Sequence, residues 1–427
     1  MGFRSNCCCS NPLLDSFYSM KTGFLRRIAT LLLVLGVILP ASAFASPSLN
    51  TEMWGLRVLE GFFPQIRGEL RKQQDSALWK DRYYAGNSAW RGPRGERNEL
   101  HVIVISDLNG SYGSLDYRQD VHRAVEEIIA RRPDVVLSTG DMVAGQREGL
   151  DYRGMWQGFH EAVTIPLKEA GIPFLITPGN HDGAGTPRFA HERAIFVDEW
   201  EIHRPKVTFV DDTHYPTRYS AVVGPVFFIS LDSTTVGPLS RDQMRWLEVQ
   251  LKRAANYPVK IVFGHVPLYA VAYNKQREII GDPALEALFN KHGVQAYISG
   301  HHHAYYPGAR GSLRLVSMPC LGSGLRRLIA TNQGYSPRGF VEFVAAEGGL
   351  YDLDSWKGPD FKEVVSRDEL PAKIGLAKGP LVRDDLLGLD LRSRPLMIDT
   401  TVPRGTVAEG REGGVRRGPA LPADLFE

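Results

Sequence analysis

Short, almost wholly apolar runs recur from about residue 100 onward, separated by polar and glycine-rich stretches. These runs are rich in β-branched residues and are bounded by Gly, Pro or polar residues, a pattern that predicts buried strands. In chain order they read HVIVIS, PDVVLSTG, PFLITPG, VFFISLDS, KIVFGH, AYISGH and RLVSMP. Between them, the spacing of apolar residues over 118–131 and 240–254 predicts amphipathic helices, the second beginning at a serine cap. Strands alternating with helices predict an α/β fold built of packed layers.

The pattern changes on both sides of this region. Residues 46–99 carry a helix-like apolar face followed by a polar loop, so we expect a mainly helical N-terminal extension. Periodicity fades beyond residue 350, and the end of the chain is rich in Gly, Pro and Arg, which predicts a partly disordered tail over 351–427. The strand-bearing domain should therefore cover residues 100–350.

The N-terminus has the layout of a secretory signal peptide. Basic residues follow Met20, an apolar run covers 28–39, and Ala43-Phe44-Ala45 forms a small-x-small cleavage site. The apolar run is too short to span a bilayer comfortably, so we expect no membrane span in the mature chain. We predict that residues 1–45 are removed, with Met20 as the true start, and that the protein is periplasmic or secreted. An uncleaved anchor and a buried N-terminal helix are the alternatives.

Composition and charge limit the function only weakly. The formal net charge is +2 and hydrophobic residues make up 43% of the chain, which is ordinary for a soluble globular protein. The chain has no run of basic residues of the kind that binds nucleic acid. Only Cys320 follows the predicted cleavage site, so the mature chain can form no internal disulfide. A periplasmic location is compatible with a large core that needs no such bond.

Side chains able to bind metal ions follow five of the predicted strands. They are Asp107 and Asn109, then Asp141, then Asn180, His181 and Asp182, then His265, and finally His301, His302 and His303. In layered α/β folds, ligands bind beyond the carboxyl ends of strands, so these side chains should share one cleft. Mixed carboxylate, amide and imidazole ligands suit manganese, iron or zinc.

Each of these residues also has a plainer explanation when taken alone. Asp107 could cap a turn, His265 could be a hydrogen-bonded core histidine, and 301–303 could be a solvated surface tract. The string Gly179-Asn180-His181-Asp182 is more specific. All five clusters occur in order, each directly after a strand, and this favours a shared site.

The five clusters resemble the motifs of the calcineurin-like metallophosphoesterases. That family's pattern runs D-x-H, G-D, G-N-H-[DE], G-H and G-H-x-H, and here it is distributed over residues 100–345. The resemblance implies a four-layer αββα sandwich, in which two mixed β-sheets are packed between helices. It also implies a dinuclear metal centre.

Roles for the matching positions follow from the resemblance. One metal would be held by Asp107, Asp141 and His303, and the second by Asn180, His265 and His301, with Asp141 bridging the two. His181 would donate a proton to the leaving oxygen, with Asp182 as a possible partner that orients it. Asn109 stands where the family usually has His, which would weaken the first site or favour manganese. Ala144 stands where purple acid phosphatases have a tyrosine ligand, which argues against that subtype.

The expected reaction is hydrolysis of a phosphate ester by a hydroxide that bridges two divalent or trivalent ions of Mn, Fe or Zn. The substrate would be a small-molecule or polymer phosphoester, and both phosphatase and phosphodiesterase activity fit. One alternative is a metal- or ligand-binding protein on a degenerate phosphoesterase scaffold, which Asn109 favours and the retained His181 opposes. A nuclease that uses the same metal pair is another, which the absence of a basic stripe disfavours.

Overall fold

The structure, a computed structural model, describes residues 99–329, 334–376 and 379–387. The predicted signal peptide, nearly all of the N-terminal extension and the end of the tail lie outside these residues. Within the described ranges, no helix is both long enough and apolar enough to cross a membrane.

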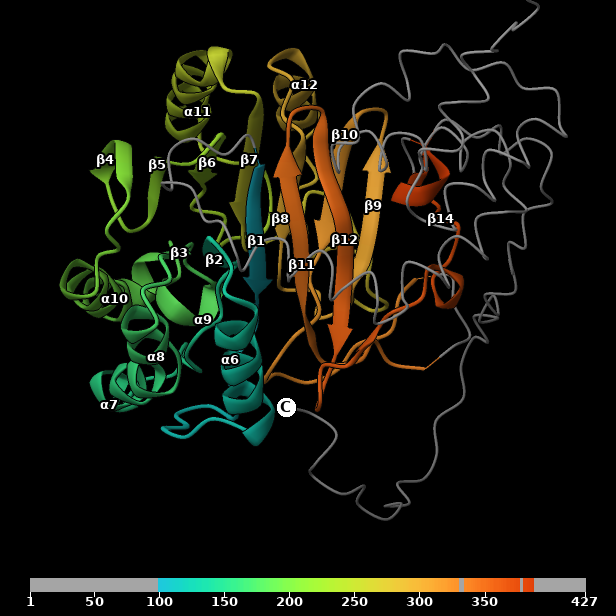
Figure 1. The fold of residues 1–427 in the computed structure, drawn as a ribbon. Coiled ribbons are helices and arrows are strands. Elements are labelled where there is room, and N and C mark those ends of the chain that lie inside the picture. The colour runs from blue at the N-terminus through green and yellow to red at the C-terminus, as the bar shows by residue number, and fades with distance from the viewer. Residues whose placement is uncertain (1–98, 330–333, 377–378, 388–427) are drawn as a thin grey trace, which may run out of the picture. The chain divides into compact units, whose positions relative to one another are not determined.

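The first of two sheets is mixed and, among the described residues, has six strands in the order β13-β12-β11-β1-β2-β3 (Figure 1). β1 pairs in parallel with β2, which pairs in parallel with β3, whereas β11 to β13 are antiparallel. The strands are β1 (Glu99–Ile105), β2 (Val135–Ser138), β3 (Phe174–Ile176), β11 (Gly339–Ala346), β12 (Gly349–Lys357) and β13 (Glu363–Val364).

The second sheet has nine strands over the same described ranges, in the order β14-β15-β9-β10-β8-β7-β6-β5-β4. Its centre, from β6 through β7 and β8 to β10, is parallel, and both margins are antiparallel. The strands are β4 (Thr208–His214), β5 (Arg218–Val223), β6 (Val226–Ser230), β7 (Val259–Gly264), β8 (Ala296–Ser299), β9 (Tyr306–Arg310), β10 (Leu313–Ser317), β14 (Lys373–Ile374) and β15 (Leu381–Arg383).

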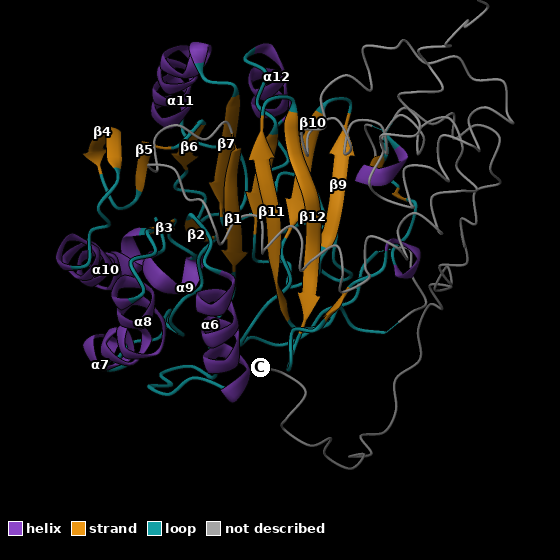
Figure 2. Cartoon of the chain, in the orientation of Figure 1, coloured by secondary structure: helices purple, strands orange, loops and turns teal. Residues whose placement is uncertain are grey.

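Helices connect the parallel strands and cover the two sheets (Figure 2). They are α6 (Gln119–Arg131), α7 (Tyr152–Phe159), α8 (Ile165–Glu169), α9 (Asn180–Gly183), α10 (Ala190–Ile202), α11 (Arg241–Arg253) and α12 (Pro283–Lys291). Helices α6 to α10 follow strands of the first sheet along the chain, and α11 and α12 follow strands of the second. A π-helical turn, His160–Thr164, joins α7 to α8. The predicted αββα sandwich of two mixed sheets flanked by helices is confirmed.

The buried residues explain why these segments form these elements. The middle of β1 is fully buried at Val102, Ile103 and Val104, and it belongs to one apolar cluster that includes strands of both sheets. The two predicted helices are confirmed as α6 and α11, and the side chain of Ser240 caps α11 by accepting from the backbone N–H of Gln243 at 3.2 Å. All seven predicted strands are also present.

The sheets extend beyond the predicted limit of the domain. Residue 350 lies inside β12, β13 follows in the first sheet, and β14 and β15 add to the second. The β15 strand pairs with β9 through Val382 and Ala309. At least residues 351–376 and 379–387 are therefore part of the folded unit.

Candidate metal centre

The predicted ligands stand directly after strands, at abrupt turns of the backbone. Asp107, Asp141, His301 and His303 all have a left-handed backbone, with φ of 51°, 53°, 64° and 48°. This conformation costs a non-glycine residue about 1–2 kcal/mol and is concentrated at functional sites. Here it reverses the chain at the carboxyl ends of β1, β2 and β8. The turns bring side chains from distant parts of the sequence together.

A glycine allows the turns after β2 and β3 to approach each other. Gly140 has φ of 94°, and a Cβ at this position would lie 2.5 Å from the backbone nitrogen of Gly179. A larger residue would push the two turns apart. Gly140 therefore fixes the spacing between Asp141 and Asn180.

Four ligand atoms converge in what we call the His265 half of the centre, formed by Asp141, Asn180, His265 and His301. Nε2 of His265 lies 2.9 Å from Oδ1 of Asn180, 3.2 Å from Nδ1 of His301 and 3.4 Å from Oδ2 of Asp141. Ligands that share one ion, with bonds of about 2.0–2.2 Å, are separated by similar distances. The carbonyl oxygen of Thr139 lies 2.9 Å from Nδ1 of His265 and holds the ring with Nε2 toward this cluster.

Asp107, Asp141 and His303 form the other part of the centre, which we call the Asp107 half. Nε2 of His303 lies 3.0 Å from Oδ1 of Asp107, and one ligand atom from each of the three residues lies within 4.8 Å of the others. His265, His301 and Asp141 form a second such group, so Asp141 is common to both. All of these residues except His301 are buried. The residues fit a pair of ions with one bridging carboxylate.

Asn109 has a different partner. Its side-chain oxygen accepts a short hydrogen bond from the hydroxyl of Ser323, which also lies 3.1 Å from the backbone oxygen of Asn109. The Asp107 half therefore has three predicted ligands facing one another, whereas the fourth is paired with a neighbouring loop.

Electrostatics fit a site made for cations. Burial alone would raise the pKa of Asp107, but the facing His303 holds it below its usual value. Likewise, burial opposes ionisation of Asp141, but His265 and His181 lower the pKa of this carboxyl well below its ordinary range. Burial lowers the pKa of His265, whereas Asp141 and Asp107 raise it, to about 9. Metal binding to this site would displace a proton from His265.

The structure places His181 next to the cluster of predicted metal ligands but not within it. Its backbone N–H donates to Oδ1 of Asp141 at 2.9 Å, and its ring Nδ1 lies 3.1 Å from the carbonyl oxygen of Gly145. The Tyr112 ring lies 5.4 Å away, and the Arg147 guanidinium stacks 3.6 Å above Tyr112. Nε2 of His181 is thus the nitrogen left for a substrate.

The carboxylate of Asp182 connects backbone segments. It accepts from the backbone N–H groups of Met142, Val143 and Gly179 at 2.7, 2.9 and 2.8 Å. No contact between this carboxylate and the His181 ring is present in the described residues. The oxygen that orients the ring belongs to Gly145.

Several residues that support the ligands have no motif of their own. Oε2 of Glu278 lies 2.9 Å from Nε2 of His301, and the Gly324 carbonyl lies 2.7 Å from Nδ1 of His303. The hydroxyl of Ser106 donates to Asp107 at 2.5 Å and accepts from the hydroxyl of Thr139. Such partners fix the orientation of metal-binding side chains. Glu278 lies in the loop between β7 and α12 and belongs to none of the five clusters found in the sequence.

His302 is directed elsewhere. Nε2 of its ring lies 3.0 Å from the carbonyl oxygen of Glu278, and its Nδ1 accepts from the backbone N–H groups of Val271 and Ala272. The His302 ring therefore takes no part in the ligand cluster. Its ring holds the loop that carries Glu278.

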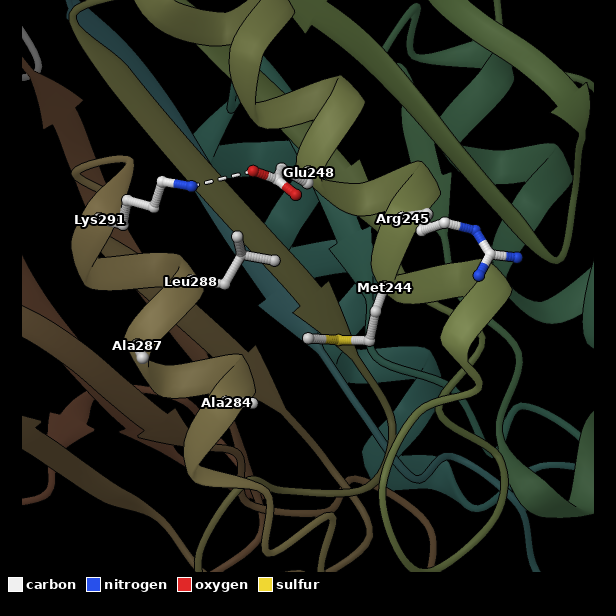
Figure 3. A pocket seen from close by; sticks show the side chains of 7 residues that line it. All are labelled: Met244, Arg245, Glu248, Ala284, Ala287, Leu288 and Lys291. Carbon is white, nitrogen blue, oxygen red and sulfur yellow. Dashed lines mark hydrogen bonds and ion pairs between the residues drawn. The ribbon is translucent and has the colours of Figure 1, made fainter.

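A separate open groove lies between α11 and α12 (Figure 3). It is lined by Met244, Arg245, Glu248, Ala284, Ala287, Leu288 and Lys291, and an ion pair between Lys291 and Glu248 crosses it at 2.9 Å. None of these residues belongs to the ligand cluster.

Comparison with known proteins gives a consistent result. The family described as Calcineurin-like phosphoesterase matches residues 100–305. A probable glycerophosphodiester phosphodiesterase, GpdQ, from Arcobacter nitrofigilis is 28% identical over 47% of this chain and 71% of its own length. Purple acid phosphatase 18 from Arabidopsis thaliana is 30% identical over 38% of this chain and 37% of its own length.

Solved structures add a weaker likeness. Purple acid phosphatase PPD1 from yellow lupin seeds is 18% identical, with a TM-score of 0.48 over 64% of this chain and 54% of its own. The dimetal phosphatase from Danio rerio is 15% identical, with a TM-score of 0.41 over 60% of this chain and 95% of its own.

Proposed function

Because the chain belongs to the calcineurin-like phosphoesterase superfamily, a family of metal-dependent phosphatases and phosphodiesterases, we propose that it hydrolyses a phosphate ester at a dinuclear metal centre. The observation that carries the proposal is the convergence of Asp107, Asp141, His265, His301 and His303 in two groups that share Asp141. Residues nearly two hundred positions apart meet here, and the fold alone does not require carboxylates and imidazoles at these positions.

The residues present fit two cations. Asp141, Asn180, His265 and His301 would hold one, and Asp107, Asp141 and His303 would hold the other. Bound cations would supply a nucleophilic water at neutral pH and neutralise the charge of the phosphate oxygens. Ligands of this mixed type suit manganese, iron or zinc.

His181 would act on the leaving group. Gly145 accepts from the Nδ1–H of its ring, and the backbone N–H of His181 is held by the bridging Asp141. The ring is thus held next to the ligand cluster, and its Nε2 has no hydrogen-bond partner among the described residues. A proton delivered from this nitrogen to a departing alkoxide would accelerate the reaction about 10²- to 10⁴-fold. Tyr112 lies next to the same ring and Arg147 stacks on Tyr112, and these two side chains would contact the organic group of the substrate.

A panel of phosphoesters tests the proposal. Purified protein should hydrolyse aryl phosphate mono- or diesters, lose this activity in a chelator and regain it with Mn²⁺. A glycerophosphodiester belongs in the panel because of the Arcobacter relative. Protein that binds two ions and cleaves no member would instead be a binding protein on a degenerate scaffold, the alternative that the Asn109–Ser323 contact favours.

We also propose that the protein is exported, on the basis of the signal-like segment over residues 20–45. Cell fractionation and N-terminal sequencing of the mature protein test this. A mature chain that begins at Ser46 in the periplasm or medium supports export, and an intact N-terminus in the cytoplasm contradicts it.

A further inference from the structure

A second group of potential metal ligands lies among the helices, apart from the strand ends that carry the dinuclear centre. It consists of His160, Glu199 and His203, and one ligand atom from each lies within 4.8 Å of the others. His160 opens the π-helical turn after α7, Glu199 lies on α10, and His203 directly follows α10. α7 and α10 are in contact and lie close together in Figure 1. None of the motifs of the dinuclear centre includes these residues.

Two imidazole nitrogens of this group are buried without a hydrogen-bond partner in the part of the chain that the structure describes. His160 is 3% exposed, and neither its Nε2 nor the buried Nδ1 of His203 has a hydrogen-bond partner among the described residues. A buried polar atom without a partner costs about 1–3 kcal/mol, so two of them side by side require an explanation. The rings of His160 and His203 stack with centroids 3.7 Å apart. Burial lowers the pKa of both histidines, that of His160 to about 3.

The surroundings hold the group as a metal site requires. Oγ1 of Thr164 lies 2.9 Å from Nδ1 of His160 and can accept a hydrogen bond from an N–H at this position. Nε2 is then the ring nitrogen that carries the lone pair. Oε2 of Glu199 lies 3.7 Å from that Nε2, while Arg153 holds the other oxygen of Glu199 at 2.8 Å. Hydroxyl and guanidinium partners of this kind orient metal ligands from behind. π-helical turns also occur frequently at functional sites.

We propose that His160, Glu199 and His203 bind a single borderline transition-metal ion such as Zn²⁺, separate from the dinuclear centre. Two imidazoles and one carboxylate match the protein ligands that zinc commonly takes. Binding requires the stacked rings to turn so that both lone pairs meet the ion. His203 can make this adjustment because it is half-buried and lies at the end of its helix. Mn²⁺ stands lowest in the order of affinities for such a site, so Zn²⁺, Ni²⁺ and Cu²⁺ should distinguish it from the dinuclear centre.

Zinc counting tests the proposal with matched variants of the full chain. Equilibrium dialysis should give one more Zn²⁺ for the wild type than for His203→Gln or Glu199→Gln. His191→Gln and Asp198→Asn change an exposed histidine and the neighbouring carboxylate on the same helix, so they should keep the wild-type count. Circular dichroism identifies any variant that fails to fold. Equal counts in the wild type and both folded site variants would overturn the proposal, as would equal losses in the two controls.

A local optical signal provides a second readout. The rings of Trp156 and Trp200 lie 5.7 and 5.5 Å from that of His160, so Cu²⁺ bound here should quench their fluorescence. Quenching should weaken in His203→Gln and persist in His191→Gln, and quenching unchanged in His203→Gln would contradict the proposal. Phosphoesterase turnover in Mn²⁺ should be the same in all these proteins. A chain without turnover that still loses one Zn²⁺ in His203→Gln would disprove the proposed function and leave this site intact.

Discussion

The two halves of the metal centre differ in the number of ligands that converge in them. In the His265 half, ligand atoms of Asp141, Asn180 and His301 lie 2.9–3.4 Å from Nε2 of His265. The Thr139 carbonyl and Glu278 hold the two imidazoles from behind. In the Asp107 half only three ligands converge, because the Asn109 amide pairs with Ser323. A half with fewer direct ligands should bind its ion more weakly. The Asp107 half should therefore release its ion first, and turnover should follow its occupancy.

Removal of the bridging carboxylate should have the largest effect because both halves share it. Asp141→Asn should lower turnover about 10³-fold or more and reduce the content of both ions, since metal stabilisation of the transition state is worth several kcal/mol. Metal analysis together with hydrolysis of an aryl phosphodiester measures this. The control is Asp182→Asn, a nearby buried substitution that should lower thermal stability while the metals stay bound. If Asp141→Asn emptied only one half, the residue would not be a bridge.

Loss of His181, the proposed general acid, should slow the chemical step and leave an ion bound in both halves. His181→Ala should reduce kcat about 10²- to 10⁴-fold. The reduction should be larger for alkyl esters than for nitrophenyl esters, because a good leaving group needs less help from a proton. Steady-state kinetics on matched alkyl and aryl substrates, with metal content measured in parallel, provide the test. Equal losses of metal and activity would show that the residue is structural.

Substitution of Glu278 tests the metal affinity of the His265 half, which we expect to bind its ion more tightly. Its carboxylate accepts from the His301 ring and so presents the other ring nitrogen to the ion. Glu278→Ala should weaken metal affinity in the His265 half about 10- to 100-fold. Glu278→Gln keeps an acceptor oxygen and should recover most of the affinity. A competition titration with a chromophoric chelator measures both, and indistinguishable affinities for wild type and Glu278→Ala would exclude the role.

Restoring the histidine that the family usually has at position 109 should make the metal affinities of the two halves more similar. Asn109→His should tighten the weaker ion about tenfold, a gain of about 1.4 kcal/mol, because imidazole binds borderline metals better than an amide does. Ser323→Ala is the companion variant, since it frees the Asn109 oxygen and should give a smaller gain of the same sign. Stepwise metal titration of the apoprotein separates the two affinities. Weaker binding in both variants would show that the Asn109–Ser323 pair supports the site as it stands.

Much of the architecture was predictable from local pattern. Strands such as β1, β7 and β8 are mostly buried and consist mainly of apolar residues, which makes them conspicuous in the sequence. The motif residues after them were predictable for the same reason, since polar residues rarely interrupt such runs. By contrast, β14 and β15 are too short and too mixed in composition to show a period.

The arrangement inside the centre was less predictable. The sequence places Asp107 and Asn109 in one cluster after the same strand, but Asp107 has a left-handed backbone and Asn109 faces Ser323. His301 and His303 also have a left-handed backbone, and the His302 ring between them contacts the loop that carries Glu278. Glu278 acts through its contact with His301, which lies 23 residues further along the chain, and no local sequence pattern predicts this contact.

The central claim is that hydrolysis requires an ion in each half of the centre. The most direct measurement is activity toward an aryl phosphodiester as metal-free protein is titrated with Mn²⁺, with bound metal counted at each step. The account predicts little activity after the first equivalent, which fills the His265 half, and a rise to the maximum with the second. Full activity in metal-free protein, or no activity with both equivalents bound, would contradict it.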